Sequence, residues 1–479
     1  MPQVSPSHSV TLRVRYPSRA RTLARITGAI ADEGAMIRSV SIVGDANGTT
    51  TRAIDVDASD EQHECRIAAA VAGVDEVELL GITDRTLDLH VGGKIQVENR
   101  VPLDDRDALS RAYTPGVARV CHRVADDLAA AYQLTIKGNM VAVVSDGSAV
   151  LGLGNIGPYG ALPVMEGKAM LFKQFAGIDA FPICLDTQDT EEIIETVRHL
   201  APVFGGINLE DISAPRCFEI EERLRELLDI PVFHDDQHGT AVVVCAGLLN
   251  ALKLTGRSLS EVRVAISGAG AAGMAVSNLL LALGVGDLVV CDSVGAIYEG
   301  RPKGMNSFKD RLAARSNKVG VTGGLDEAVR GAEVFVGVSQ PNVLSVEALQ
   351  TMAPAPIIFA LANPVPEVDP QAARKHAAIL ATGRSDLPNQ INNAVAFPGI
   401  FRGLLDVRAS GVNEAMLLAA VKALASAVPE DTLAADHIIP SVFQSGLSQV
   451  IAKAVSEAAR AGGLARDMNT RAHQLICEL

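Results

Sequence analysis

The N-terminal 88 residues alternate between strand-like and helix-like patterns of hydrophobic positions. Val10, Leu12 and Val14 alternate with polar neighbours, as in a strand with one buried face. Apolar residues then recur at helical spacing from Leu23 and stop before Gly34. The pattern continues with strands at 36–43 and 49–56, a helix around 67–71 and a strand at 77–82. This β-α-β-β-α-β order predicts a ferredoxin-like α+β domain at residues 1–88.

A second segment, residues 89–240, carries shorter apolar runs that indicate buried strands. Such runs occupy 141–144, 181–185 and 231–233. Between them, Thr190 is expected to cap a helix that buries Ile193 and Val197. We therefore expect a second, α/β domain here.

From residue 241 onward, strands and helices alternate as in a doubly wound parallel sheet. The predicted strands are 262–267, 288–291, 334–338, 357–360 and 379–381, and the closing helices are 413–427 and 437–461. The chain is thus expected to be an α/β protein of three domains, in which 241–479 forms a Rossmann-type sheet with C-terminal helices.

A glycine-rich turn follows the first strand of this third domain and leads into a helix. Its G-x-G-x-x-G spacing lets the backbone turn tightly and approach a pyrophosphate, which the helix N-terminus then faces. The residues expected to contact a nicotinamide dinucleotide are Gly268, Gly270, Ala271, Ala272, Gly273 and Asp292. Asp292 favours NAD, because a carboxylate accepts hydrogen bonds from ribose hydroxyls. NADP stays open, since Arg301, Lys303 and Lys309 follow closely and could meet a phosphate.

Paired carboxylates of the second domain predict a cation site. Glu210 and Asp211 follow an apolar run, and Asp235 and Asp236 precede a predicted helix. Oxygen-only ligands favour Mg²⁺ or Mn²⁺. His234 and His238 raise the alternative of Zn²⁺, but they bracket a predicted turn, so we interpret them as supporting or packing groups.

Composition and charge narrow the range of partners. The formal charge of −14 argues against a nucleic-acid partner, which needs a basic face. The uncharged run 264–286 is long enough for a membrane span, but its glycines are explained by the dinucleotide turn. Seven cysteines, none in a C-x-x-C pair, favour a reduced, cytoplasmic setting.

Several motifs, in this order, resemble those of the malic enzymes. They are Y-T-P-G-V (113–117), L-G-L-G-N-I-G (151–157), G-K (167–168), E-D-I (210–212), H-D-D-Q-H-G-T (234–240), G-A-G-A-A-G (268–273), F-A-L-A-N-P (359–364) and N-Q-I-N-N-A-V-A-F-P-G (389–399). The resemblance covers residues from about 95 to 460 and fits the shorter, bacterial type. It implies oxidative decarboxylation of L-malate to pyruvate and CO₂, with NAD(P)⁺ and a divalent metal.

The resemblance also implies roles for individual residues. Tyr113 would be the general acid and Lys168 the general base, with Asp235 beside Lys168. The implied metal ligands are Glu210, Asp211 and Asp236, and the implied substrate or nicotinamide contacts are Asn363 and Asn392 or Asn393. One departure is Ala149, where larger malic enzymes carry a substrate-binding Arg. Arg384 and Lys137 are candidates to replace it.

The N-terminal domain resembles an ACT domain by its order and length. ACT domains pair and often bind amino acids, which implies a homodimer or higher homo-oligomer and a small effector near residues 32–35. A pairing module without a ligand is an equal alternative. For the whole chain, the alternatives are a metal-independent dehydrogenase with a catalytic lysine, such as an amino-acid dehydrogenase, and a cofactor-binding sensor without turnover.

Overall fold

The computed structural model describes residues 4–150 and 152–466, so Leu151 of the L-G-L-G motif lies outside the described residues. The chain divides into two compact units, Met1–Val97 and Glu98–Leu479. The domain boundaries predicted at residues 88 and 240 stay predictions. Position 240 falls within a long helix, α10 (Asp235–Thr255).

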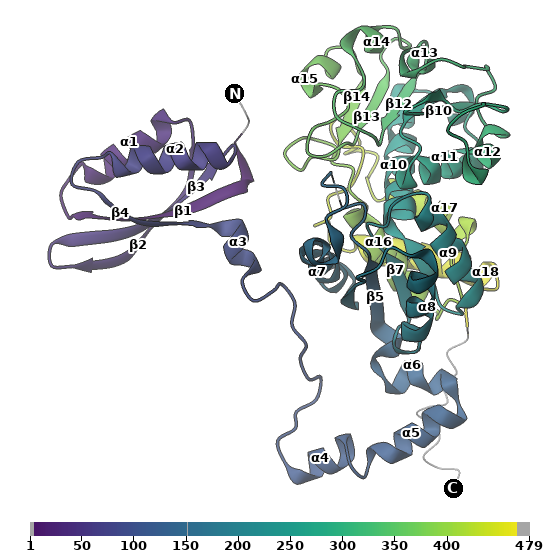
Figure 1. The fold of residues 1–479 in the computed structure, drawn as a ribbon, viewed down its shortest axis with the longest axis horizontal. Helices are drawn as coiled ribbons and strands as arrows, with labels where there is room; N and C mark the ends of the chain where they lie inside the picture. Colours follow the sequence, from purple (N-terminus) through teal and green to yellow (C-terminus); the bar gives the residue numbers. More distant parts are fainter. Residues whose placement is uncertain (1–3, 151, 467–479) are drawn as a thin grey trace. The chain divides into compact units, whose positions relative to one another are not determined.

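The first unit is a four-stranded antiparallel sheet with two helices on one face (Figure 1). Its elements are β1 (Ser5–Pro17), α1 (Thr22–Asp32), β2 (Met36–Ala46), β3 (Thr49–Ala58), α2 (Glu61–Ala72) and β4 (Glu78–Asp84), followed by α3 (Arg85–His90). The strand order is β2-β3-β1-β4, and Leu12, Ile26, Ile54 and Ile67 are fully buried in its core. The predicted ferredoxin-like unit is therefore confirmed.

The second unit starts with short helices that bury few side chains. They are α4 (Arg106–Ala112), α5 (Val117–Asp126), η1 (Leu128–Ala130), α6 (Ala131–Leu134) and η2 (Ile136–Asn139). Helix α4 packs on α5, and α5 packs on η1 and α6. Neither α4 nor α5 has a buried residue.

A parallel sheet with strand order β6-β5-β7-β8 follows. Its elements are β5 (Met140–Ser145), α7 (Gly157–Ala176), β6 (Asp179–Cys184), α8 (Thr190–Leu200), η3 (Ala201–Val203), β7 (Gly206–Leu209), α9 (Arg216–Leu227) and β8 (Val232–His234). All four strands point the same way, so their carboxyl ends meet at one edge. The predicted cap of α8 was wrong, because Asp189 rather than Thr190 occupies the N-cap and accepts the Glu192 N–H at 3.0 Å.

The second parallel sheet has the strand order β11-β10-β9-β12-β13-β14, which confirms the predicted doubly wound sheet. Its strands are β9 (Arg263–Ser267), β10 (Asp287–Asp292), the antiparallel β11 (Gly295–Ala296), β12 (Val334–Gly337), β13 (Ile357–Ala360) and β14 (Ile379–Thr382). Its helices are α11 (Ala271–Leu283), α12 (Ser307–Ala313), α13 (Leu325–Val329), α14 (Val346–Gln350) and α15 (Pro370–Ala373), and η4 (Leu259–Glu261) precedes β9. Strands β10 and β12 flank β9 on opposite sides, so the strand order reverses at β9, the position at which doubly wound sheets bind ligands.

The closing helices are η5 (Asn393–Val395), α16 (Phe397–Asp406), α17 (Glu414–Ser426) and α18 (Leu447–Ala461). The predicted start of the last helix at 437 was wrong, because residues 437–446 form turns and Gly446 takes a left-handed conformation at the N-cap. Among the described residues, α10 alone is long and apolar enough to cross a membrane, and it is mostly buried against α11 and α17. The cytoplasmic location remains a prediction.

Candidate active site

Four carboxylates lie close together at the carboxyl edge of the first parallel sheet, β6-β5-β7-β8. Glu210 and Asp211 follow β7, while Asp235 and Asp236 form the first turn of α10 rather than a separate turn before it. Carboxylate oxygens of Glu210, Asp211 and Asp236 lie within 4.8 Å of one another. The Asp211 N–H donates to Asp236 Oδ2 at 2.8 Å, which joins the two segments. The predicted ligands therefore meet in space.

Lys168 reaches this cluster from the middle of α7. Its Nζ lies 2.6 Å from Asp235 Oδ2 and 2.9 Å from Glu210 Oε1, and the side chain is almost fully buried. The ammonium also sits 4.5 Å from the centre of the Phe397 ring. Because Phe172 packs edge-on against the same ring, α7 and α16 hold the lysine in a fixed place.

The electrostatics of the cluster show an excess of negative charge. Burial raises the pKa of Glu210 to about 7, of Asp235 to about 7 and of Asp236 to about 6, although Lys168 opposes each shift. Burial also acts to lower the pKa of Lys168, but Asp235 and Glu210 outweigh it and raise that pKa above its usual value. One ammonium thus faces four carboxyl groups, and a divalent cation would relieve the imbalance.

The donor set fits Mg²⁺ or Mn²⁺, because it consists of oxygen atoms only. His238 instead lies 2.8 Å from Glu221. His234 is fully buried, and its Nδ1 lies 3.9 Å from Asp236 Oδ2, but it is not among the groups whose ligand atoms lie within 4.8 Å of one another. The structure therefore gives the zinc alternative no support.

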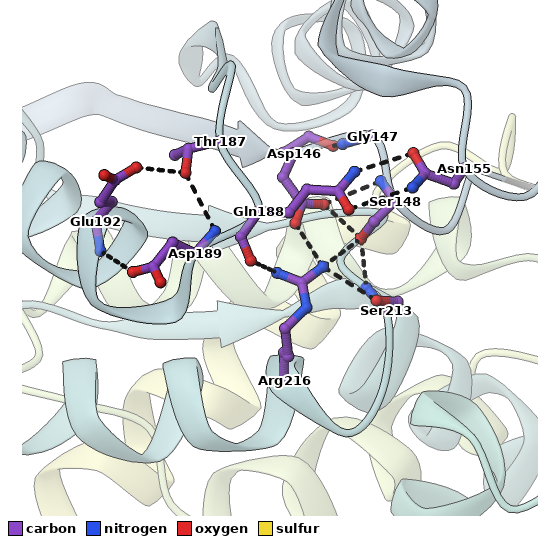
Figure 2. A network of polar contacts seen from close by, with 11 residues as sticks. Asp146, Gly147, Ser148, Asn155, Thr187, Gln188, Asp189, Glu192, Ser213 and Arg216 are labelled. Atoms are coloured by element: carbon purple, nitrogen blue, oxygen red, sulfur yellow. Dashed lines mark hydrogen bonds and ion pairs between the residues drawn. The ribbon is translucent and has the colours of Figure 1, made fainter.

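A polar network joins the loops that follow β5 and β7 (Figure 2). The Arg216 guanidinium donates to Asp146 Oδ2 at 2.8 Å and to Ser148 Oγ at 3.0 Å. Ala149, at the position of the missing Arg, donates its N–H to the Asp211 carbonyl at 2.9 Å. Asp211 has a left-handed φ of 54°, which these contacts help to maintain.

The structure does not bring Tyr113 to this cluster. Tyr113 ends α4, and its side chain is 67% exposed. Helix α4 packs on α5, and both lie apart from α7 in Figure 1. Within the described residues, Tyr113 has no hydrogen bond to Lys168 or to the carboxylates. The predicted acid and base therefore do not meet in this arrangement of one chain.

The two candidates to replace the substrate Arg differ in position. Lys137 precedes β5 at the opposite edge of the sheet and donates to the carbonyls of Ala201 and Phe204 at 3.1 and 2.7 Å. Lys137 was therefore a wrong candidate. Arg384 follows β14 at the carboxyl edge of the second sheet, where it is paired with Asp386.

The glycine turn after β9 has the geometry that a dinucleotide cradle needs. Gly268 has a φ of 112°, and a Cβ there would lie 2.4 Å from the Val338 carbonyl oxygen. A Cβ on Gly273 would lie 1.9 Å from the Gly268 carbonyl oxygen, so α11 packs this close only without one. Gly270 faces open space, where a pyrophosphate can approach the N-terminus of α11.

Asp292 ends β10, as predicted, but two cations hold it. Arg301 contacts its two oxygens at 2.8 and 2.5 Å, and Lys309 Nζ lies 2.6 Å away. Burial would raise the pKa of Asp292, but the hydrogen bonds from Arg301 and Lys309 keep it well below its usual value. Lys303 is exposed.

Asparagine residues that follow strands of the second parallel sheet contact segments around the first parallel sheet. A Cβ on Gly152 would lie 2.5 Å from the Asn363 carbonyl oxygen, which places the L-G-L-G loop against the A-N-P segment. Asn393 lies against Gly239, one turn after Asp235. The Asn392 side chain instead accepts the Ala394 N–H at 2.9 Å and caps η5. Of this pair, Asn393 is therefore the one beside the carboxylate cluster.

The sequence interpretation missed Glu221, which lies 4% exposed on α9. A signal was present, because Glu221 falls at the helical spacing of Cys217, Ile220 and Leu224, all buried. A charged residue on the apolar face of a helix requires partners, and the sequence did not reveal which.

The fold and the cluster together define an enzyme class that combines a dinucleotide-binding sheet with a buried carboxylate–lysine site. Family sequence models agree: "Malic enzyme, N-terminal domain" matches residues 92–225, and "Malic enzyme, NAD binding domain" matches 237–460. An NAD-dependent malic enzyme of Geobacillus stearothermophilus is 53% identical over 461 residues, 96% of each chain. An NADP-dependent malic enzyme of Escherichia coli is 49% identical over 79% of this chain and 52% of its own length.

A crystal structure of NAD-dependent malic enzyme from Thermotoga maritima aligns with a TM-score of 0.74 and 51% identity, covering 77% of this chain and 98% of that one. The chain therefore belongs to the malic enzyme family.

Proposed function

We propose that this chain oxidises L-malate with NAD⁺ or NADP⁺ and releases pyruvate and CO₂ at the carboxyl edges of its two parallel sheets. The observation that carries this proposal is the meeting of Lys168 with Glu210 and Asp235, beside Asp211 and Asp236. The loop at Gly152 also contacts Asn363, which follows β13 of the dinucleotide-binding sheet. Pyruvate is the product expected from loss of the carboxyl group next to C3.

In this scheme, Lys168 removes the proton of the C2 hydroxyl while C2 transfers a hydride to the nicotinamide. Glu210, Asp211 and Asp236 would hold a divalent cation, which would supply Lewis acidity when bound. Lys168 must be neutral to act, yet Asp235 and Glu210 raise its pKa. Positive charge at the carboxylates would oppose that shift, so metal binding and base activation are expected to be coupled.

Tyr113 is proposed as the acid that protonates C3 after CO₂ leaves, supplied by a second copy of the chain. The support is its exposed position on α4, together with the apolar residues Leu109 and Val120 exposed on α4 and α5. Mixing inactive Tyr113→Phe and Lys168→Ala chains should recover about a quarter of wild-type activity, since half of the dimers are hybrids with one intact site. No recovery after subunit exchange would place both groups in one chain.

Cofactor preference is proposed to be NAD⁺, with NADP⁺ accepted. Asp292 offers a carboxylate to a ribose, but Arg301 and Lys309 leave this locus with a net positive charge. That charge reduces the repulsion of a 2′-phosphate. Parallel kinetics with NAD⁺ and NADP⁺ at saturating Mn²⁺ measure the preference, and exclusive use of NADP⁺ would contradict it.

The first unit is proposed to bind a small amino-acid or acyl effector at the turn between α1 and β2. His63 fixes this turn, since its Nδ1 accepts the Ser59 N–H at 3.1 Å and its Nε2–H donates to the Glu33 carbonyl at 2.9 Å. Calorimetry of the full chain against an amino-acid panel tests the idea. Absence of heat with every compound would leave only a role in pairing.

The main test is NAD(P)H formation from malate with and without EDTA, together with CO₂ detection. We expect EDTA to abolish activity and Mn²⁺ to restore it. Lys168→Ala should lower turnover by about 100-fold or more, in line with loss of a general base. Activity that survives full metal removal would favour the metal-independent dehydrogenase instead, and cofactor binding without turnover would favour the sensor.

A further inference from the structure

Glu221 is a buried carboxylate outside the metal cluster that no step of the proposed reaction uses. It lies in the second turn of α9, and it is almost completely shielded from solvent. Its partners supply enough opposite charge and hydrogen bonding to hold it ionised. Burial alone would raise the pKa of Glu221, but Arg225 and His238 bring it down to about 2.

The hydrogen bonds of Glu221 converge on the short segment that carries two of the active-site carboxylates. Its Oε1 accepts the His234 main-chain N–H at 3.1 Å, and its Oε2 accepts Gln237 Nε2 at 2.9 Å. His238 Nε2 lies 2.8 and 2.9 Å from the two oxygens. These donors stand immediately before and after Asp235 and Asp236. The Glu221 carboxylate therefore holds this segment by hydrogen bonds on both sides of the two aspartates.

These hydrogen bonds replace the side-chain N-cap that α10 lacks. His234 is the N-cap of α10, and its own side chain makes no capping hydrogen bond. In a capping box, a Glu within the same helix accepts the N-cap N–H. Here Glu221 does so from a different helix, which fixes the first turn of α10 relative to α9.

An ordinary helix ion pair would not account for this arrangement. Arg225 follows Glu221 by one turn and contacts Oε1 at 2.7 Å, as many exposed i, i+4 pairs do. Exposed pairs contribute little to stability, and they do not require burial of the carboxylate. Arg225 also donates from Nε to the Val232 carbonyl at 3.1 Å, so it too is tied to β8.

We infer that Glu221 is a positioning residue of the metal site, which holds the first turn of α10 so that Asp236 meets Glu210 and Asp211. This inference rests on the proposed metal site. Arg216, on the first turn of the same helix, fastens the loop of Asp211 through Asp146 and Ser148 (Figure 2). Helix α9 therefore aligns both segments from which the cation ligands come.

The test is Mn²⁺ binding to the full chain, measured by calorimetry without malate or dinucleotide, well below the melting temperature. Wild-type protein must bind Mn²⁺ first, and failure at this step would refute the metal site itself rather than the role of Glu221. Glu221→Gln should then raise the Mn²⁺ dissociation constant about 10- to 100-fold, as loss of a supporting partner does at other metal sites. The amide keeps one acceptor oxygen but loses the negative charge and turns an NH₂ group toward donors at the other position. The contacts are therefore weakened without a change of size.

The matched control is Glu222→Gln on the same helix. Glu222 is exposed and pairs with Arg311 at 2.9 Å, so this variant should bind Mn²⁺ like wild type. Glu221→Asp keeps the charge on a shorter side chain and should recover part of the affinity. NADH binding should be unchanged in all three variants, because the cradle lies on the other sheet.

A folded Glu221→Gln protein with a lowered melting temperature but wild-type Mn²⁺ affinity would overturn the inference and leave only a structural role. If this variant does not fold, the Mn²⁺ affinity of Gln237→Leu tests the inference instead. It removes one donor to Glu221 and leaves the charge paired with Arg225 and His238. A smaller loss of Mn²⁺ affinity supports the inference, and unchanged affinity contradicts it.

Discussion

The carboxyl edges of the two parallel sheets are built by opposite means. At the edge of β7 and β8, buried side chains form the site, and their charges are not balanced by the protein alone. At the edge of β9 and β12, the backbone forms the site. Gly268 and Gly273 are required there because a Cβ at either position would clash with a main-chain carbonyl. The first edge suits a cation, and the second suits a pyrophosphate.

Each edge is braced by one buried glutamate, and the two differ in charge balance. Glu221 faces Arg225 and His238, which bring its pKa down to about 2. Glu367 is fully buried and accepts the N–H groups of Ser339 and Ala362, both at 2.9 Å. Burial outweighs these hydrogen bonds and raises the pKa of Glu367. Main-chain donors thus position a loop, whereas cationic donors also hold a carboxylate ionised.

The largest expected effect comes from removing a carboxylate at the first edge. Asp236→Asn should lower kcat/KM for malate by more than about 100-fold, because losing a ligand costs more than losing a supporting partner. NADH binding, measured by fluorescence titration, should be unchanged. Loss of both Mn²⁺ and NADH binding in a folded protein would show that the two edges are not independent.

A smaller effect is expected from filling space at the second edge. Gly273→Ala places a Cβ against the Gly268 carbonyl, and overpacking of this kind costs about 1–3 kcal/mol. If that cost falls on the bound conformation, NADH binding should weaken by about tenfold or more while Mn²⁺ binding is kept. Wild-type NADH affinity in this variant would mean that the cradle adjusts, unlike the metal edge.

The smallest expected effect is a pH dependence of stabilisation by metal. The raised pKa values of Glu210, Asp235 and Asp236, about 6 to 7, mean that the folded apoprotein holds protons that the unfolded chain has released above about pH 4. Their contribution to stability is therefore lost as pH rises through 6 to 7. A cation must displace these protons at pH 6 but not at pH 8.

Thermal melts with and without Mn²⁺ check this. The rise in melting temperature on adding Mn²⁺ should be a few degrees larger at pH 8 than at pH 6. Asp236→Asn is the control and should show little rise at either pH. An equal rise at both pH values would contradict the charge imbalance assigned to the metal edge.

Local patterns predicted most of the fold, and the errors have physical causes. Strands β9, β10, β12, β13 and β14 were predicted because buried strands are apolar runs between helices, whereas the two-residue strand β11 was not predicted. The start of α18 was misplaced by ten residues, because an apolar pattern continues through the turns at 437–446. Lys137 was assigned wrongly because charge says nothing about which edge of a sheet a residue occupies.

The sequence by itself determined the ferredoxin-like unit, the doubly wound sheet and the dinucleotide cradle. All of these depend on residues close together in the chain, where periodicity and glycine spacing are visible. Only the tertiary structure decided which groups surround Lys168, that Arg301 and Lys309 hold Asp292, and that Glu221 grips the first turn of α10. These contacts join segments that meet only after the strands align, and the burial that shifts their pKa values arises at the same step.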